Sequence, residues 1–236
     1  MTNEEKIILA ATFGEIEVVK GLITVSDPRA NYSQALQIAA YSGHKEIVKM
    51  LIPVSAPQAN DSAALTLAAE RRHKEIVEML LPFSDPKAND SEALIDAARG
   101  GYEEIVEMLL PVSDPKANDS EALRYAAYNG YKEMVKMLLP VSDPNAEGSG
   151  ALQSAARKGH HGIVELLIPV SDVEAACEQL DESEISLVKA MEADFRMKEL
   201  QASTVQIPQS FKGCVDQARS DSQGTAAIQR AQARRL

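Results

Sequence analysis

The chain has 236 residues, of which 35 are Asp or Glu and 24 are Lys or Arg, so its formal net charge is −11. A body of this charge repels phosphate backbones, so nucleic acid is excluded as the expected partner. No apolar run is long enough to cross a bilayer, so no membrane partner is expected. The N-terminus begins acidic where a secretory signal would begin basic, and the expected location is therefore the cytoplasm.

One fourteen-residue stretch recurs along most of the chain. It reads LPVSDPKANDSEAL at residues 110–123, and near-copies begin at Ile23, Ile52, Leu81 and Leu139, in steps of 29 residues. Ala-Ala pairs follow the same step and begin at Ala10, Ala39, Ala68, Ala97, Ala126 and Ala155. A fixed period of this length is typical of a solenoid. We therefore expect an all-α solenoid of about six helix-pair repeats, with units near 1–24, 25–53, 54–82, 83–111, 112–140 and 141–172.

The first unit has the features of an N-terminal cap. It keeps the repeat's Gly14 but has Thr24 where later units have proline. Thr2 and Glu5 have the spacing of a capping box, in which a hydroxyl and a carboxylate each bind a free backbone N–H at a helix start. A helix is therefore predicted to begin at this point.

Each later unit is predicted to contain two short helices, and one unit serves as the example. Its first helix starts at Asp90 or Ser91, because either side chain can accept from the free N–H groups of a helix. Leu94, Ala97 and Ala98 follow with helical spacing and lie on one face. The small alanines let a neighbouring helix approach closely.

The second helix of that unit is predicted at 103–110. The Gly-Gly pair at 100–101 ends the first helix, since a left-handed residue is most favourable as glycine. Pro111 stops the second helix, because proline disfavours helical geometry in the residue before it. Asp114 and Pro115 then suit the first two places of a type I turn, which leads into the next unit.

Two further segments are expected beyond residue 172, where the repeat register fails. The first, 173–202, has a helical apolar stripe that is predicted to cap the array, since the last repeat of a solenoid would otherwise expose its apolar face. The alternative is that this stripe forms a homodimer interface. The second segment, 203–236, has five bases and two acids, a charge of +3 that leaves −14 for the residues before it. Its polar composition predicts a disordered basic tail.

The helical part of the repeat resembles the ankyrin repeat. The segments ALRYAAYNGYKEMVKMLL at 122–139 and ALQIAAYSGHKEIVKMLI at 35–52 are similar to the pattern Leu-x-x-Ala-Ala-x-x-Gly-His-x-x-Ile-Val-x-x-Leu-Leu. The resemblance covers residues 1–172 and implies an ankyrin-like α-solenoid with a concave binding face. It places glycines between the helices at Gly43, Gly101, Gly130 and Gly159, and it places His44, His73 and His160 in the family's next position, that of a histidine.

The chain also departs from the ankyrin pattern. Its period is shorter than the family's usual period of about 33 residues, and a compact Pro-Val-Ser-Asp-Pro joint takes the place of the hairpin finger. The family's Thr-Pro-Leu-His tetrad is absent, so its hydrogen-bond network is not expected. Arg72 occupies a glycine place, which predicts either a strained residue or a relaxed turn in that unit.

Positions that vary between units are the candidates for recognition, because the fixed Ala, Leu, Pro and Gly positions serve packing and turns. Two variable positions precede the inter-helix glycine and two lie on the first helix, and in the ankyrin family this region borders the binding face. Tyr and Arg recur there, and both are enriched at interface hot spots. The predicted protein-binding residues are Tyr41, Glu70, Arg71, Arg99, Arg124, Tyr125, Tyr128, Arg157 and Lys158.

Catalytic, metal and cofactor sites are not expected. The histidines fall at the start of second helices, about one repeat apart, and no second group converges on them. They are His44, His73, His160 and His161. Cys177 and Cys214 lie outside the repeats without metal-ligand spacing, and Cys214 has no base beside it. The expected protein is therefore not an enzyme.

The leading functional hypothesis is an adaptor or inhibitor that captures another protein on the face made by the first helices. Its mechanism is rigid presentation of that face. The alternative is a secreted bacterial or parasite effector in the host cytosol, whose repeats select a host protein. In that alternative the basic tail at 203–236 is an export signal or a second contact.

Overall fold

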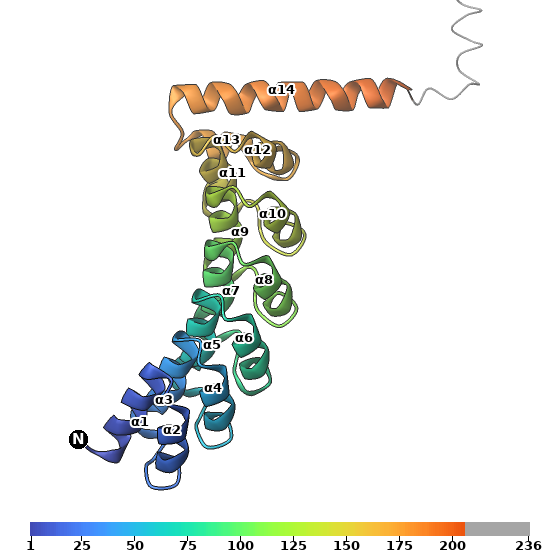
Figure 1. Ribbon diagram of the computed structural model, residues 1–236. Helices are drawn as coiled ribbons and strands as arrows, with labels where there is room; N and C mark the ends of the chain where they lie inside the picture. The colour runs from blue at the N-terminus through green and yellow to red at the C-terminus, as the bar shows by residue number, and fades with distance from the viewer. Residues whose placement is uncertain (206–236) are drawn as a thin grey trace, which may run out of the picture. The chain divides into compact units, whose positions relative to one another are not determined.

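The computed structural model describes residues 1–205, and this part of the chain is all helical. Six helix pairs follow one another, as predicted (Figure 1). The first helices of the pairs are α1 (Asn3–Phe13), α3 (Ala30–Tyr41), α5 (Ala59–Glu70), α7 (Ala88–Gly100), α9 (Ala117–Asn129) and α11 (Ala146–Arg157). The second helices are α2 (Ile16–Leu22), α4 (Lys45–Leu51), α6 (Lys74–Leu80), α8 (Glu103–Leu109), α10 (Lys132–Leu138) and α12 (His161–Leu167).

The capping box predicted at the first helix is confirmed. Thr2 Oγ1 accepts from the Glu5 N–H at 3.2 Å, and Glu5 Oε2 accepts from the Thr2 N–H at 2.9 Å. Gly14 ends α1 in the left-handed region, with φ of 73°. Both ends of α1 are therefore satisfied in the way that its sequence indicates.

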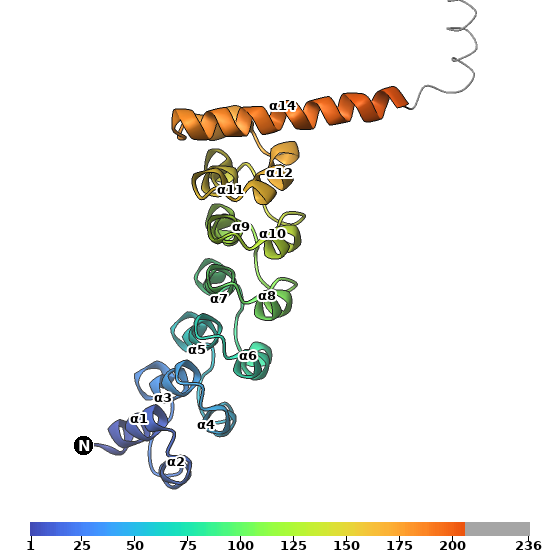
Figure 2. The ribbon, with the colours of Figure 1, turned by 45° about the horizontal axis from the view of Figure 1, so that its top comes forward.

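The first helices form one row and the second helices form another beside it (Figures 1 and 2). Each first helix packs on the next, from α1 through α11, because the Ala-Ala pairs on the facing sides are small and almost completely buried. The second helices carry larger side chains, such as Ile105, Val106 and Leu109, and they fan out along the outside of a curve. The row of first helices consequently lines the inner side of the array.

The joint between repeats folds as the sequence predicts. Helix α8 ends at Leu109, just before Pro111, and Gly101 ends α7 with φ of 76°. The Ala117 N–H donates to the Asp114 carbonyl oxygen at 3.2 Å, the bond expected of a turn that begins at Asp114. Asp114 Oδ1 also accepts from the Lys116 N–H at 3.0 Å.

The predicted start of the first helix was wrong. Asn89, Asp90 and Ser91 have φ values of 47°, 54° and 59°, so three successive residues lie in the left-handed region, and no side chain caps α7. The same left-handed stretch recurs in α5, α9 and α11. Asn, Asp and Ser enter this region at lower cost than bulky residues because their short side chains hydrogen-bond locally.

The serine that ends each left-handed stretch binds the following repeat instead of its own helix. Ser91 Oγ accepts from the Asp114 N–H at 2.9 Å, across 23 residues of chain. The equivalent serines bind in the same way and are buried; they are Ser33, Ser62, Ser120 and Ser149. A one-per-repeat ladder of hydrogen bonds therefore joins the units where the ankyrin tetrad is missing.

Arg72 is a strained residue, the first of the two outcomes predicted for it. Its φ is 62°, while glycine occupies the equivalent left-handed position at Gly14, Gly43, Gly101, Gly130 and Gly159. A side chain costs roughly 1–2 kcal/mol in this region, and glycine has no such cost.

Replacing Arg72 with glycine is expected to raise the free energy of unfolding by about 1 kcal/mol, since the strain relieved exceeds the entropy that glycine adds to the unfolded chain. Urea denaturation followed by circular dichroism measures the change. The control is Arg71→Gly, because Arg71 has φ of −93° and gains nothing from glycine. Equal effects of the two substitutions would contradict the assignment of strain.

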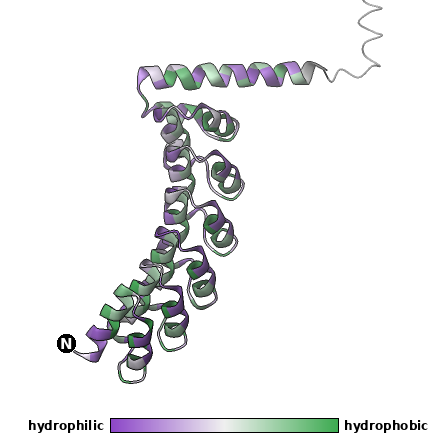
Figure 3. Ribbon diagram, viewed as in Figure 1, coloured by the Kyte–Doolittle hydropathy of each residue, from purple (hydrophilic) through white to green (hydrophobic). Residues whose placement is uncertain are grey.

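Two helices follow the last repeat, in the region predicted to cap the array. Helix α13 (Val173–Cys177) packs on α11, and α14 (Glu182–Val205) carries hydrophobic and hydrophilic residues in alternation (Figure 3). Val173, Ala176 and Val188 are buried. They belong to the compact unit formed by residues 1–191. Homodimer formation through 173–202 stays a prediction, and the predicted tail lies outside the described residues from position 206 onward.

Candidate protein-binding surface

The predicted binding residues lie on the first helices, mostly near their C-terminal ends, and we call this set the ledge. Tyr41 and Tyr128 are 39% and 45% exposed, and the Arg124 side chain is 32% exposed. The residues at the same repeat positions as Arg124 and Tyr125 in the adjacent repeats are buried; they are Ile95, Asp96, Gln153 and Ser154. The ledge is defined as Tyr41, Glu70, Arg71, Arg99, Arg124, Tyr125, Tyr128, Arg157 and Lys158.

Stacked cations and rings join neighbouring repeats along the ledge. The Arg71 guanidinium lies 4.0 Å from the centre of the Tyr41 ring, and that of Arg99 lies 4.5 Å from the Tyr125 ring. The Lys158 amine lies 4.3 Å from the Tyr128 ring. Each such contact contributes about 0.5–1 kcal/mol at an exposed site. Their larger effect is to hold flexible basic side chains in one orientation.

Ion pairs orient three of the arginines. Arg71 Nη2 lies 3.6 Å from Glu70 Oε1. Arg99 donates to Asp96 Oδ1 at 2.7 Å. Arg124 lies between two acids, 2.8 Å from Glu121 and 3.2 Å from Glu147, the latter on the next repeat. Exposed pairs of this kind add little stability, but they orient the guanidinium groups.

Arg157 differs from the other ledge residues. Its Nη2 donates to the Gln179 carbonyl oxygen at 2.5 Å, in the segment that follows the array. Arg157 therefore helps to hold the C-terminal segment against the last repeat. Arg157 occupies the same repeat position as Arg99, so the sequence alone does not show this different role. The hydrogen-bond partner, Gln179, lies 22 residues further along the chain.

Asp96 is a feature that sequence reasoning missed. It is only 8% exposed, and burial raises its pKa to about 6, although the Arg99 guanidinium opposes the shift. Glu92, Glu70 and Glu121 add to the shift. Asp96 lines a groove of about 350 Å³ between α3, α5 and α7, together with Asp61, Glu70 and Glu92. The only signal in the sequence was a single acid in a column of otherwise uncharged residues.

Asp96→Asn is expected to stabilise the protein in a pH-dependent manner. Because the pKa of Asp96 is higher in the folded chain than its ordinary value of 3.8, the stability that this group contributes is present below pH 3.8 and is lost as the pH rises through 6. Asparagine avoids that loss. We expect a gain of about 1–2 kcal/mol at pH 7.5, after allowance for the lost ion pair, and about half of it at pH 5.

Chemical denaturation at the two pH values measures this gain. The control is Asp119→Asn, which removes an exposed carboxylate from the next repeat. A gain for Asp96→Asn that does not change between pH 5 and pH 7.5 would show that ionisation of this carboxyl is not its source.

Three of the histidines bind the backbone of the preceding repeat close to the ledge. His44, His73 and His160 each place Nε2 3.0–3.1 Å from a carbonyl oxygen of the preceding repeat, on Thr12, Tyr41 and Tyr128 respectively. A carbonyl oxygen only accepts, so Nε2 carries the proton. Burial, and after it the Arg71 charge, lowers the pKa of His73.

Within residues 1–205, no group of His, Cys, Asp and Glu side chains could hold a metal ion.

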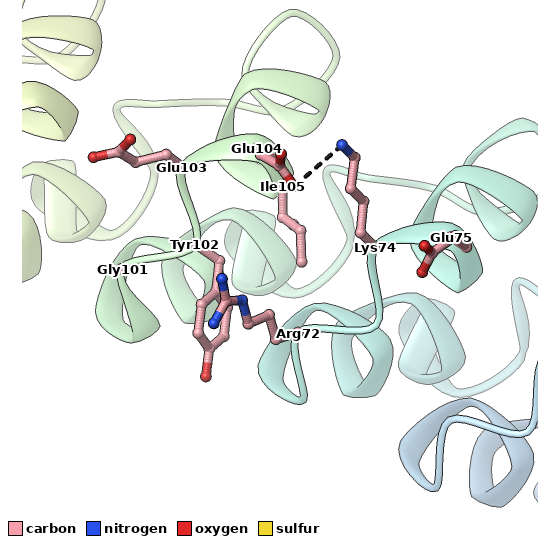
Figure 4. A pocket seen from close by; sticks show the side chains of 8 residues that line it. All are labelled: Arg72, Lys74, Glu75, Gly101, Tyr102, Glu103, Glu104 and Ile105. Atoms are coloured by element: carbon pink, nitrogen blue, oxygen red, sulfur yellow. Dashed lines mark ion pairs between the residues drawn. The ribbon is translucent and has the colours of Figure 1, made fainter.

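A second cleft, of about 430 Å³, lies where the strained turn meets the next repeat (Figure 4). The Arg72 guanidinium lies 5.7 Å from the centre of the Tyr102 ring, and Lys74 forms an ion pair with Glu104 at 3.1 Å. In four other turns, at Gly14, Gly43, Gly101 and Gly130, a Cβ added to the glycine would lie 2.6–2.8 Å from a His or Tyr ring of the next repeat. The cleft therefore forms because Arg72 occupies a position that is glycine in the other repeats. Its lining contains both basic and acidic side chains, and these do not point toward a common centre.

Comparison with known proteins identifies the class of fold. The family model of ankyrin repeats in three copies matches the chain at residues 7–92, 54–119 and 94–177. The chain therefore belongs to the ankyrin-repeat family. Comparison with curated protein sequences finds no match. Among residues 1–205, no helix combines the length and apolar character that a membrane span requires.

Proposed function

We propose that the protein is a binding scaffold that captures another protein on the ledge. Ankyrin-repeat arrays are typically protein-binding scaffolds, and the family is usually non-catalytic. The observation that supports this surface is the set of three cation–ring contacts that join neighbouring repeats at exposed, variable positions. The invariant Ala-Ala and Leu positions of the first helices are buried instead.

The mechanism is recognition by side chains that are already in place. Binding normally costs about 0.5–1.5 kcal/mol for each long side chain that it immobilises. Arg71, Arg99 and Lys158 lie on tyrosine rings before any partner arrives, so part of this cost is met in the free protein. Tyr and Arg also supply the contact area and directed hydrogen bonds found at hot spots.

The combined substitution of Tyr125, Tyr128 and Arg99 with alanine is expected to abolish partner capture. The intact chain is immobilised, bound proteins are identified by mass spectrometry, and the capture is repeated with the triple variant. The matched control replaces Phe83, Val112 and Lys116 with alanine, because these exposed side chains lie on the joints, away from the ledge. Equal capture by the ledge variant and the intact chain would sink the proposal.

A further inference from the structure

The ledge is a basic strip on an acidic body. The two variable columns before the inter-helix glycine contain four bases, Arg71, Arg99, Arg157 and Lys158, and one acid, Glu70, which leaves +3. All four bases lie in the third to sixth repeats. Residues 1–202 together carry −14, so this strip stands out from its surroundings.

From this charge pattern we propose that the ledge binds an acidic, carboxylate-rich segment of its partner protein. The inference rests on the proposed function and adds the chemistry of the partner. An arginine on a ring uses one face of its guanidinium, and its N–H donors lie along the edge, in a fork that matches a carboxylate. Arg71 and Arg99 already place part of this edge against Glu70 and Asp96, so an acidic partner competes with these two internal acids. Lys158 forms no ion pair with any residue in the described part of the chain.

The spacing of the bases also restricts the bound segment. Packed helices lie about 8–10 Å apart, so Arg71 and Arg99, one repeat apart, are separated by about that distance. A polyproline II segment rises about 3.1 Å per residue and presents every third side chain on one face, about 9 Å apart. Lys158 lies two repeats beyond Arg99, and neutral Tyr128 and Asn129 fill the intervening repeat. The matching pattern is an acid, a second acid three residues later and a third acid six residues after that.

The groove beside Asp96 favours the opposite kind of partner, a basic one. Asp61, Glu70, Glu92 and Asp96 line it, so a partner that lay there would carry basic side chains. A basic partner would depend on those carboxylates, and an acidic one would depend on the ledge cations. The two outcomes are therefore separable by substitution.

The test is selection of random twelve-residue peptides, displayed on phage, against the full-length chain. Enriched peptides are expected to be rich in Asp and Glu, with acids three residues apart. Enrichment is expected to fall at least tenfold against a variant with Arg71, Arg99 and Lys158 replaced by glutamine. The control replaces Lys49, Lys87 and Lys116 with glutamine; it changes the net charge equally at exposed positions off the ledge and should keep the enrichment.

Any of these results would overturn the inference: no enriched peptide, enriched peptides without excess acid, or basic peptides that are lost on Asp61→Asn with Glu92→Gln. Equal losses on the ledge and control variants would also overturn it, since they would indicate a general charge effect. If the ledge variant loses neutral peptides while the control keeps them, the proposed function stands and the acidic partner is wrong.

Discussion

Alanine at Gly130 is expected to destabilise the protein by about 3 kcal/mol. Gly130 has φ of 83°, and a Cβ there would lie 2.7 Å from His160 Cε1. The left-handed backbone costs roughly 1–2 kcal/mol with a side chain, and overpacking adds about 1–3 kcal/mol. His160 also binds the Tyr128 carbonyl oxygen, so the ring cannot move away without losing that bond.

Gly159→Ala is the matched control for this prediction. Gly159 has φ of 70°, but no atom lies within 4 Å of an added Cβ. Only the backbone cost of about 1–2 kcal/mol is then expected. Urea denaturation of both variants measures the difference. Equal losses at the two glycines would show that contact with the histidine ring contributes nothing.

Ser120→Ala is expected to cost about 1–3 kcal/mol. Its Oγ accepts from the Asp143 N–H at 2.9 Å, and the serine is 2% exposed. Alanine leaves that N–H, at a part-buried joint, without its serine partner, and a donor that loses its partner away from water carries a desolvation penalty. Because the bond joins two repeats, its loss is also expected to reduce the cooperativity of unfolding.

Ser84→Ala serves as the comparison. Ser84 Oγ is buried and has no hydrogen-bond partner among the described residues, so alanine there is expected to change the free energy of unfolding by no more than about 0.5 kcal/mol. Thermal and urea unfolding of the two serine variants test the ladder. Similar losses at Ser120 and Ser84 would mean that the interrepeat bond is not what stabilises the joint.

Much of the fold could be predicted from the sequence because the repeat is local. The Ala-Ala pairs, and the proline that follows the second helix in every unit but the first, act on residues a few positions away, and both recur with the 29-residue step. The glycine that follows the first helix in five of the six pairs is equally local. Helix pairs and their order therefore follow from the sequence alone.

The start of the first helix could not be predicted in the same way. Asp90 and Ser91 suit a helix cap, but they also suit left-handed backbone, and local propensity does not separate these choices. What decides is Ser91 binding the Asp114 N–H of the next repeat, a contact between residues distant in sequence. An interpretation of Ser91 as a helix cap considers only its own helix and leaves out the bond to the next repeat.

The candidate surface was predictable in its positions and not in its contacts. Variation between units marks the ledge positions, although Ile95 and Asp96, at the same repeat positions as Arg124 and Tyr125, are buried. The placement of Arg99 on the Tyr125 ring, and of Arg157 on the Gln179 carbonyl, depends on how adjacent units are offset. Burial of Asp96 depends on the same offset.

The most direct test of this account is the dissociation constant of a captured partner for the intact chain and for the Tyr125, Tyr128 and Arg99 triple alanine variant. Isothermal titration calorimetry measures both, with circular dichroism to establish that the variant is folded. Loss of three hot-spot side chains predicts affinity at least about 100-fold weaker. A dissociation constant unchanged in a folded variant would contradict binding on the ledge.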